Sequence, residues 1–360
     1  MKAWYVVALL TPLAWATVSC GGSRGLAGDA GVSRDSSGSS EKPYDVGPPR
    51  DAAAEVRLDL LPDKVAFIDG RVPFGPAMDA RAVAEPLLPA TRLLAISDRE
   101  IFELDRDGLL LRTRPIPEAR NPAFLWPYGA AMTGRQHLHL AIRVLPQSGG
   151  SSGVLMTLDL ASGTYDLASA PGYEIGGLVG AFGIAAASGF VFAPNFGGEF
   201  GTIRFDLAHN TYTTLPHPED PFRYTVDVSR GLDGRIHTLT SGLFLTSYDP
   251  TSLALVRQIV LAYGPGSSGI PIRGVVVDAD GKVFAGAGDG QILRFSATGR
   301  PEQTVKVPDA YSVNDAEIDT EGHVLFGGDK GLLIFTDRAL SAQRVVQLPT
   351  THNVEIVVVE

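Results

Sequence analysis

A segment near the end of the chain occurs twice, and this repeat restricts the possible folds more than any other feature. Residues 277–295 read VDADGKVFAGAGDGQILRF, and residues 318–335 read IDTEGHVLFGGDKGLLIF. The first aspartates of the two copies, Asp278 and Asp319, lie 41 residues apart. In both copies, short β-branched and aromatic runs alternate with Asp-Gly or Glu-Gly turns, a pattern typical of antiparallel strands. A repeat of this length built from short strands indicates one blade of a β-propeller.

Weaker copies of the same unit precede these two. In each copy the third expected strand ends with an apolar residue, which is followed by an acidic or small polar residue. The six pairs are Leu104-Asp105, Leu158-Asp159, Phe205-Asp206, Tyr248-Asp249, Phe295-Ser296 and Phe335-Thr336. The sequence therefore predicts an all-β fold, a six-bladed β-propeller over residues 91–360, with seven blades as the alternative.

The two ends of the propeller region predict how the ring closes. The first copy has no innermost strand upstream of Arg92, whereas residues 349–360 read PTTHNVEIVVVE. These residues match the spacing of PDAYSVNDAEID, residues 308–319, with 11 residues from the proline to the acid in both. We expect the C-terminal strand to complete the first blade, which removes an exposed sheet edge. A stray strand on a β-sandwich is the alternative.

The N-terminal residues predict export from the cytoplasm. Lys2 precedes an apolar run, residues 4–15, that is too short to span a membrane. The chain's one cysteine, Cys20, follows small residues and precedes two glycines. This pattern resembles a bacterial lipoprotein signal, although Thr17 stands where leucine is usual. The resemblance implies that residues 1–19 are removed, that Cys20 carries fatty acids such as palmitate, and that the anchor lies in the outer membrane of a Gram-negative bacterium. The alternative is an ordinary secretory signal with a chance cysteine.

The residues between this signal and the propeller have little to bury. Residues 20–55 are rich in Gly, Ser, Asp and Pro, and we expect a disordered tether. Residues 56–90 contain four prolines after residue 72 and predict an irregular lead-in that packs on the propeller and adds a short edge strand. The mature body contains no cysteine besides Cys20, which excludes intrachain disulfides. We expect a monomer.

Net charge and motifs exclude several functions. The net charge is −10 and no basic run is present, so nucleic-acid binding is not expected. Gly286, Gly288 and Gly290 lack the spacing of a phosphate loop and precede an expected strand, which argues against nucleotide binding. The sequence contains no GxSxG or CxxC motif.

The candidate site residues are those that enter each innermost strand. In a propeller these positions surround the axis at one face, where ligands commonly bind. They are Trp126, Phe182, Tyr224, Arg273, Asn314, Asp315 and Glu355. We expect a binding mouth for a protein, peptide or glycan partner. Under the alternative interpretation Trp126 and Phe182 belong to the core, and the charged residues are solvated loop ends.

The turn motif D-x-(D/E)-G-x-(V/L), present as Asp278 to Val283 and as Asp319 to Val324, resembles the blades of NHL-type and SMP-30/lactonase-type propellers. The lactonase resemblance implies a divalent cation such as calcium on the axis, held by oxygen ligands. Asn314, Asp315 and Glu355 are the candidate ligands. The opposite side of the ring, near Trp126 and Phe182, offers no matching acids. A binding or scaffold module without a cofactor is therefore the first hypothesis, and a cation-dependent hydrolase or lactonase is the second.

His137 and His139 are two residues apart on an expected strand, so both imidazoles lie on one face. A metal pair is one interpretation. The polar face of a strand is the other, since the spacing supplies no third ligand.

Overall fold

The computed structural model describes residues 66–67, 85–117, 124–144, 152–170, 173, 183–195, 201–209, 211–215, 224–262 and 271–359. The chain divides into two units, Met1–Val56 and Arg57–Glu360, and every described residue belongs to the second. The predicted signal, Cys20 and the predicted tether lie outside the described residues. Within the described part, no helix has the length and apolar character needed to cross a membrane.

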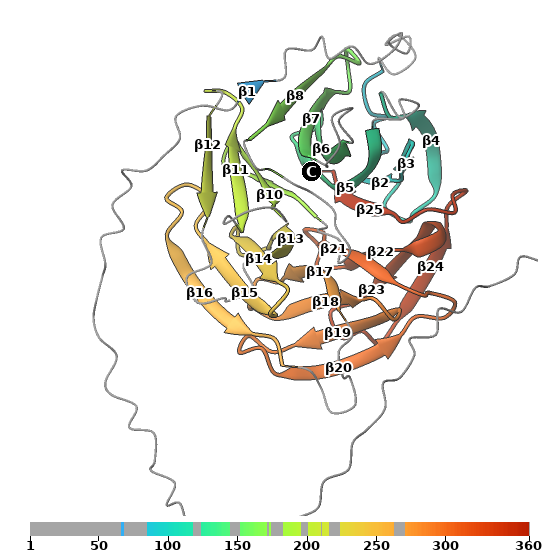
Figure 1. Ribbon diagram of the computed structural model, residues 1–360. Coiled ribbons are helices and arrows are strands. Elements are labelled where there is room, and N and C mark those ends of the chain that lie inside the picture. Colours follow the sequence, from blue (N-terminus) through green and yellow to red (C-terminus); the bar gives the residue numbers. More distant parts are fainter. Residues whose placement is uncertain are drawn as a thin grey trace, which may run out of the picture. The chain divides into compact units, whose positions relative to one another are not determined.

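The second unit is a six-bladed β-propeller, as the sequence predicts (Figure 1). Blade 1 contains β2 (Leu93–Ile96), β3 (Glu100–Leu104), β4 (Leu110–Pro115) and the C-terminal β25 (Glu355–Val358). Blade 2 contains β5 (Phe124–Thr133), β6 (His137–Val144), β7 (Ser152–Asp159) and β8 (Tyr165–Ser169). Blade 3 contains β9 (Ala185–Ala187), β10 (Phe190–Pro194), β11 (Thr202–Asp206) and β12 (Thr211–Leu215).

In the other three blades, as in blades 2 and 3, the strands follow one another from the axis outward in chain order. Blade 4 contains β13 (Thr225–Arg230), β14 (Ile236–Thr240), β15 (Phe244–Tyr248) and β16 (Leu255–Val260). Blade 5 contains β17 (Ile272–Val277), β18 (Val283–Ala287), β19 (Gln291–Phe295) and β20 (Pro301–Lys306). Blade 6 contains β21 (Val313–Ile318), β22 (Val324–Gly328), the 3-10 turn η2 (Asp329–Gly331), β23 (Leu332–Thr336) and β24 (Gln343–Gln347).

The C-terminal strand closes the ring in the predicted place. β25 pairs with β2 antiparallel, with Ile356 opposite Ala95 and Glu355 opposite Ile96. Blade 1 thus combines the first and last strands of the ring (Figure 1). Closure leaves no unpaired edge at the seam.

The repeated acidic motif forms the turn between the innermost and second strands. In blade 5, Asp278 Oδ1 accepts hydrogen bonds from the backbone N–H groups of Asp280 (2.9 Å) and Lys282 (2.8 Å). Gly281 has a φ of +78°, a conformation that L-residues with a side chain rarely adopt. Asp319 bonds the matching backbone groups in blade 6. The motif is therefore a hairpin turn, as its spacing predicts.

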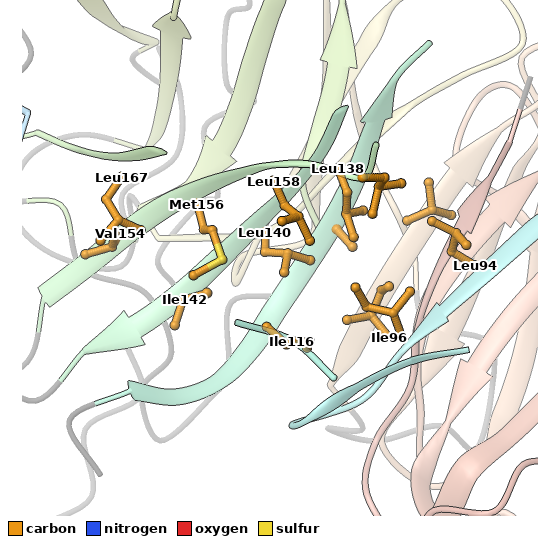
Figure 2. Packing of buried hydrophobic residues seen from close by; sticks show 14 of the residues in the cluster. Leu94, Ile96, Ile116, Leu138, Leu140, Ile142, Val154, Met156, Leu158 and Leu167 are labelled. Carbon is orange, nitrogen blue, oxygen red and sulfur yellow. The ribbon is translucent and has the colours of Figure 1, made fainter. Parts of the chain in front are cut away.

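Apolar side chains fill the spaces between neighbouring blades. Between blades 1 and 2, Leu94 and Ile96 pack in one cluster with Leu138, Leu140 and Met156, all fully buried (Figure 2). Burying one such side chain contributes about 1.5–3 kcal/mol. The rigid ring that results fixes the position of every strand start around the axis.

The described parts of the lead-in lie against blades 1 and 2. β1 (Ala66–Phe67) pairs with β8 and adds an edge strand to blade 2. Near residue 90, the buried carboxylate of Glu103 accepts hydrogen bonds from the Leu88 N–H (3.1 Å) and the Thr91 hydroxyl (2.8 Å). Its other oxygen accepts from Arg114 Nε at 2.6 Å. Burial acts to raise the pKa of Glu103, but these bonds hold that pKa below its usual value.

Candidate functional site

The candidate site surrounds the propeller axis at the face where the innermost strands begin. We call this the mouth face. It carries the connections from each outermost strand to the next innermost strand, of which the longest is residues 170–184 between β8 and β9. The turns on the opposite face are short, such as residues 134–136 between β5 and β6. Long connections on a rigid scaffold are typical of a binding face.

Several innermost strands have a bulge near their start. The register shifts between Pro127 and Gly129, Thr225 and Asp227, Ile272 and Gly274, and Val313 and Asp315. The residue after each bulge points toward the innermost strand of the next blade. With Gly183 before β9 and Glu355 at the start of β25, these positions form what we call the inner ring: Gly129, Gly183, Asp227, Gly274, Asp315 and Glu355.

Three inner-ring positions are glycine because neighbouring backbones approach closely there. A Cβ atom on Gly129 would lie 2.7 Å from the carbonyl carbon of Gly183, and one on Gly274 would lie 2.6 Å from the Asp315 Cα. A Cβ atom on Gly183 would overlap Asp227 Oδ1. Real Cβ atoms essentially never come within 3.0 Å of such neighbours. A side chain at these positions would therefore push the blades apart.

The other three positions are acidic, and we call Asp227, Asp315 and Glu355 the axial carboxyl trio. Asp227 Oδ2 accepts a hydrogen bond from the backbone N–H of Val275 in blade 5, at 2.6 Å. Asp315 Oδ2 accepts from the N–H of Ile356 in the closing strand, at 2.5 Å, and Asp315 Oδ1 accepts from the Ala316 N–H at 2.8 Å. Both aspartates thus bind the innermost strand of the following blade.

The trio is buried and lacks a matching positive charge. Each of its three residues is at most 5% exposed. Asp227 Oδ1 and Glu355 Oε2 have no hydrogen-bond partner, and no ion pair within the described ranges joins a cation to the trio. Burial raises the pKa of Asp315 to about 6 despite its two backbone bonds. Burial, together with the negative charge of Asp315, raises the pKa of Asp227 and of Glu355 well above the usual values.

The structure brings together four of the seven residues that the sequence predicts for the mouth, and it places a fifth, Tyr224, on the same face. Asp315 and Glu355 belong to the trio. Arg273 Nη1 donates a hydrogen bond to Asn314 Oδ1 at 3.0 Å, and Asn314 Nδ2 is buried without a partner. Tyr224 precedes β13 and is 42% exposed. Trp126 lies in β5, but its side chain and all of Phe182 lie outside the described residues.

Sequence reasoning missed Asp227 and Tyr311. Asp227 lies seven residues before the turn glycine Gly234, as Asp315 lies seven before Gly322, so the signal was present in the repeat spacing. Tyr311 precedes β21 on the mouth face and is 74% exposed, with its backbone N–H bonded to Asp329 Oδ1 at 3.0 Å. No periodic pattern marks Tyr311, because it lies in a connection.

The structure assigns the His-x-His pair to the polar face of β6. His139 is buried between the hydroxyls of Thr133 (2.9 Å from Nε2) and Thr157 (3.0 Å from Nδ1). Burial, with a smaller effect of His137, lowers the pKa of His139 to about 4. Across the described segments, no group of three or more His, Cys, Asp or Glu side chains has an arrangement that holds a metal ion.

Two cavities lie away from the mouth face. One, of about 260 Å³, occupies the opposite end of the central channel and is lined by residues such as Met132, Arg230 and Glu317. The other, of about 720 Å³, lies between blades 6 and 1 and includes Arg344 and His323 in its lining. The trio lines neither cavity, so its carboxyl groups are closed off from both.

Comparisons with known proteins found matches among solved structures only. No protein-family model matches the sequence, and no curated protein sequence matches it. Similar solved structures include the extracellular domain of a protein assigned to the hybrid two-component systems of B. thetaiotaomicron, with a TM-score of 0.47, 15% identity, and coverage of 75% of this chain and 36% of that chain. The present chain thus spans about a third of the length of that extracellular domain.

Two further structures match the present chain over nearly their own full length. Apo AztD from Citrobacter koseri has a TM-score of 0.44 and 14% identity, with coverage of 74% of this chain and 97% of that chain. A protein of unknown function from Bacteroides caccae has a TM-score of 0.46 and 11% identity, with coverage of 75% and 99%.

Proposed function

We propose that this chain is a binding or scaffold module of the bacterial cell envelope, which presents its mouth face to a protein, peptide or glycan partner. The observation that carries the proposal is an arc of three residues on consecutive blades. Exposed Tyr224 on blade 4 and exposed Tyr311 on blade 6 lie on either side of half-buried Arg273 on blade 5. We call these three residues the mouth arc.

The mouth arc combines the residue types that contribute most to binding surfaces. Tyrosine and arginine are enriched at interfaces and at their energetic centres. A tyrosine ring offers a flat apolar face with a polar tip, and a guanidinium offers several donors in one plane. The arc therefore suits a partner with a flat apolar face and nearby acceptor oxygens, as in a sugar ring or a peptide segment.

Hydrogen bonds near the strand starts hold two members of the mouth arc. Arg273 lies within β17 and donates to Asn314 of the next blade, while the backbone of Tyr311 is held by Asp329. Little side-chain or loop entropy is lost on binding when the contact residues are already fixed. This supports a preformed site.

The proposed location follows from the N-terminal sequence. Acylation of Cys20 would hold the chain at a membrane, and residues 20–55 would keep the propeller at a distance from the lipid surface. We propose the outer membrane of a Gram-negative bacterium as that membrane. The Cys20→Ser variant is then expected in the soluble fraction and unlabelled by a fatty-acid probe. Retention with labelling would contradict the anchor.

The binding proposal is tested on glycan and peptide arrays with the purified propeller unit. We expect the wild type to bind one class of ligand at least tenfold more tightly than an Arg273→Ala/Tyr311→Ala double variant. Arg106→Ala is the matched control, because Arg106 is exposed on the opposite face. Binding that is lost in the control but kept in the double variant would place the site elsewhere, and absence of binding to both arrays would contradict the proposal.

The second candidate function is a divalent-cation-dependent hydrolase with its site on the axis. The convergence of Asp315 and Glu355 with Asp227 favours it, whereas the arrangement of acidic and histidine side chains in the described residues does not. Metal analysis of purified protein separates the two functions. Stoichiometric calcium or zinc that is lost on Glu355→Ala would support the hydrolase, and metal-free protein with an unchanged fold would support the binding module.

A further inference from the structure

The larger of the two cavities away from the mouth face has no part in the mouth arc. It has a volume of about 720 Å³ and lies between blades 6 and 1, the two blades that meet where the ring closes. Turn residues of the face opposite the mouth, such as Asp107 and Thr320, contribute to its lining. Small-molecule sites in proteins commonly have volumes of about 300–1,000 Å³. We call this space the seam cavity.

Part of the lining of the seam cavity is apolar. Leu93 of blade 1 lines it together with Leu325 and Phe335 of blade 6, and all three belong to the cluster of buried residues between these blades. Val358, the last residue of β25, packs against the same cluster and also lines the cavity. The cavity thus borders the core between the two blades, where an apolar ligand group would be removed from water.

Two guanidinium groups of the lining have no acidic partner. Arg344 Nη1 donates to the backbone carbonyl of Asp107, and its guanidinium lies over the Phe335 ring, 4.2 Å from the centroid. Arg92 Nη1 donates to two backbone carbonyl oxygens, at 2.9 and 3.0 Å. Among the described residues, no carboxylate forms an ion pair with either arginine. Each guanidinium has five N–H donors, so both keep donors for a ligand.

Most acidic groups of the lining are already bound. Glu321 forms an ion pair with an arginine of blade 1, Asp319 Oδ1 accepts two backbone N–H bonds, and Asp337 Oδ1 accepts one at 2.8 Å. Exposed Asp107 is the remaining acid. In the described lining, two arginines without an ion partner therefore face one such carboxylate. Gln343 Nε2, which is buried without a partner, adds a further donor.

We propose that the seam cavity binds a small carboxylate with an apolar body. The apolar body packs against Leu325, Phe335 and Val358. The carboxylate accepts hydrogen bonds from Arg344 and Arg92 and supplies the negative charge that the lining lacks. A guanidinium suits this role because its planar fork of donors matches a carboxylate bidentately. The proposal does not depend on which partner the mouth arc binds.

Such a ligand touches both blades at the closure of the ring. Arg92 directly precedes β2 and Val358 ends β25, whereas Phe335 and Arg344 belong to blade 6. A ligand that binds only the folded state stabilises that state by an amount that grows with ligand concentration. The carboxylate is therefore expected to raise the melting temperature of the protein.

The first test is isothermal titration calorimetry of the purified protein with octanoate as the probe. Octanol has the same chain without the charge, and propionate has the charge with almost no chain. We expect octanoate to bind the wild type at least tenfold more tightly than either of these compounds does, and at least tenfold more tightly than it binds Arg344→Gln. Arg300→Gln is the matched control and should bind as the wild type does, because Arg300 is an exposed arginine in a blade 5 turn on the same face and does not line the cavity.

Three results of this titration would overturn the proposal. They are undetectable binding of octanoate, equal affinity for octanoate and octanol, and equal affinity of octanoate for the wild type and Arg344→Gln. A loss in Arg300→Gln as large as that in Arg344→Gln would show a general effect of surface charge and would overturn it as well.

The second test locates the ligand without any substitution. Phenylglyoxal modifies accessible guanidinium groups, and mass spectrometry gives the modification rate at each arginine. Octanoate is expected to slow the modification of exposed Arg92 and Arg344 at least fivefold and to leave that of Arg300 unchanged. Unchanged rates at Arg92 and Arg344 would place the carboxylate outside the seam cavity and overturn the proposal.

Discussion

Blade 1 contains two buried glutamates in opposite electrostatic situations. Glu103 on β3 bonds the Leu88 N–H, the Thr91 hydroxyl and the guanidinium groups of Arg112 and Arg114. Glu355 on β25 is almost equally buried, but its Oε2 has no partner and its charged neighbours are acids. The pKa of Glu103 is lowered and that of Glu355 is raised.

The comparison shows that partners, more than burial, decide whether a buried acid is ionised. Glu103 holds the lead-in near residue 90 against blade 1 as an anion, and its bonds strengthen with that charge. Glu355 lies at the seam of the ring, where burial and the neighbouring acids favour its neutral form. One blade thus carries a structural ion pair toward its outer side and a proton-dependent group at the axis.

The largest expected effect comes from removing the strand that carries Glu355. Deletion of residues 353–360 removes Val354, Ile356 and Val357 from the core, which are each at most 3% exposed. At about 1.5–3 kcal/mol for each buried side chain, the loss is comparable to the whole stability of a typical domain. We expect an unfolded or aggregated product by circular dichroism. A deletion of residue 360 alone is the control, and normal melting of the longer deletion would contradict closure by β25.

Replacing the paired glutamate should have the next largest effect. Glu103→Gln leaves the buried guanidinium of Arg114 without its ion partner, and breaking one side of a buried pair costs about 3–5 kcal/mol. The stability supplied by Glu103 is present above the unfolded pKa and is lost as pH falls, because its folded pKa is lowered. Urea denaturation at pH 7 measures the loss. Equal destabilisation by Glu103→Gln and Glu355→Gln would remove the contrast between the two glutamates.

A smaller loss of stability is expected when a side chain fills the space beside the trio. In Gly183→Ala the new Cβ overlaps Asp227 Oδ1 and the residue has a φ of +72°. We expect a loss of about 1–3 kcal/mol. Gly189→Ala is a matched control, because Gly189 has a φ of +82° but no atom within 4 Å of its added Cβ. The difference in melting temperature between the two variants isolates the clash, and equal losses would show that Asp227 moves freely.

The smallest effect is expected at the exposed pair that joins blades 6 and 1. Arg106 and Glu321 form an ion pair with both side chains more than half exposed. Arg106→Ala should therefore cost less than about 1 kcal/mol, and the loss should shrink further at high salt. Thermal melts at low and high salt provide the measurement. A loss as large as that of Glu103→Gln would mean that the seam depends on its surface charges.

Much of this fold follows from the sequence for simple physical reasons. Turn glycines such as Gly281 and Gly322 recur because the backbone there needs positive φ. The residue pairs that end each third strand recur with the blades, and their number gives the blade count. The apolar C-terminal residues predict β25 because the first repeat lacks a strand. Asp315 and Glu355 were predicted for the axis from the same alignment.

The rest depends on contacts that spacing does not encode. The spacing to Gly234 marks Asp227, but only the bulge beside it shows that its side chain faces the next blade, where it binds the Val275 N–H. The partners of Glu103 come from β4 and from an irregular lead-in, and no period links them. Even the burial of Glu355 became evident only once β25 was placed at the axis.

Infrared difference spectroscopy of the carboxyl groups tests the protonation of Glu355 most directly. At neutral pH, the folded wild type is expected to show the C=O stretching band of a protonated carboxylic acid, and that band should weaken in Glu355→Gln but persist in Glu103→Gln. A spectrum without a protonated-acid band at neutral pH, or a band that Glu355→Gln leaves unchanged, would contradict a neutral glutamate at the seam of the ring.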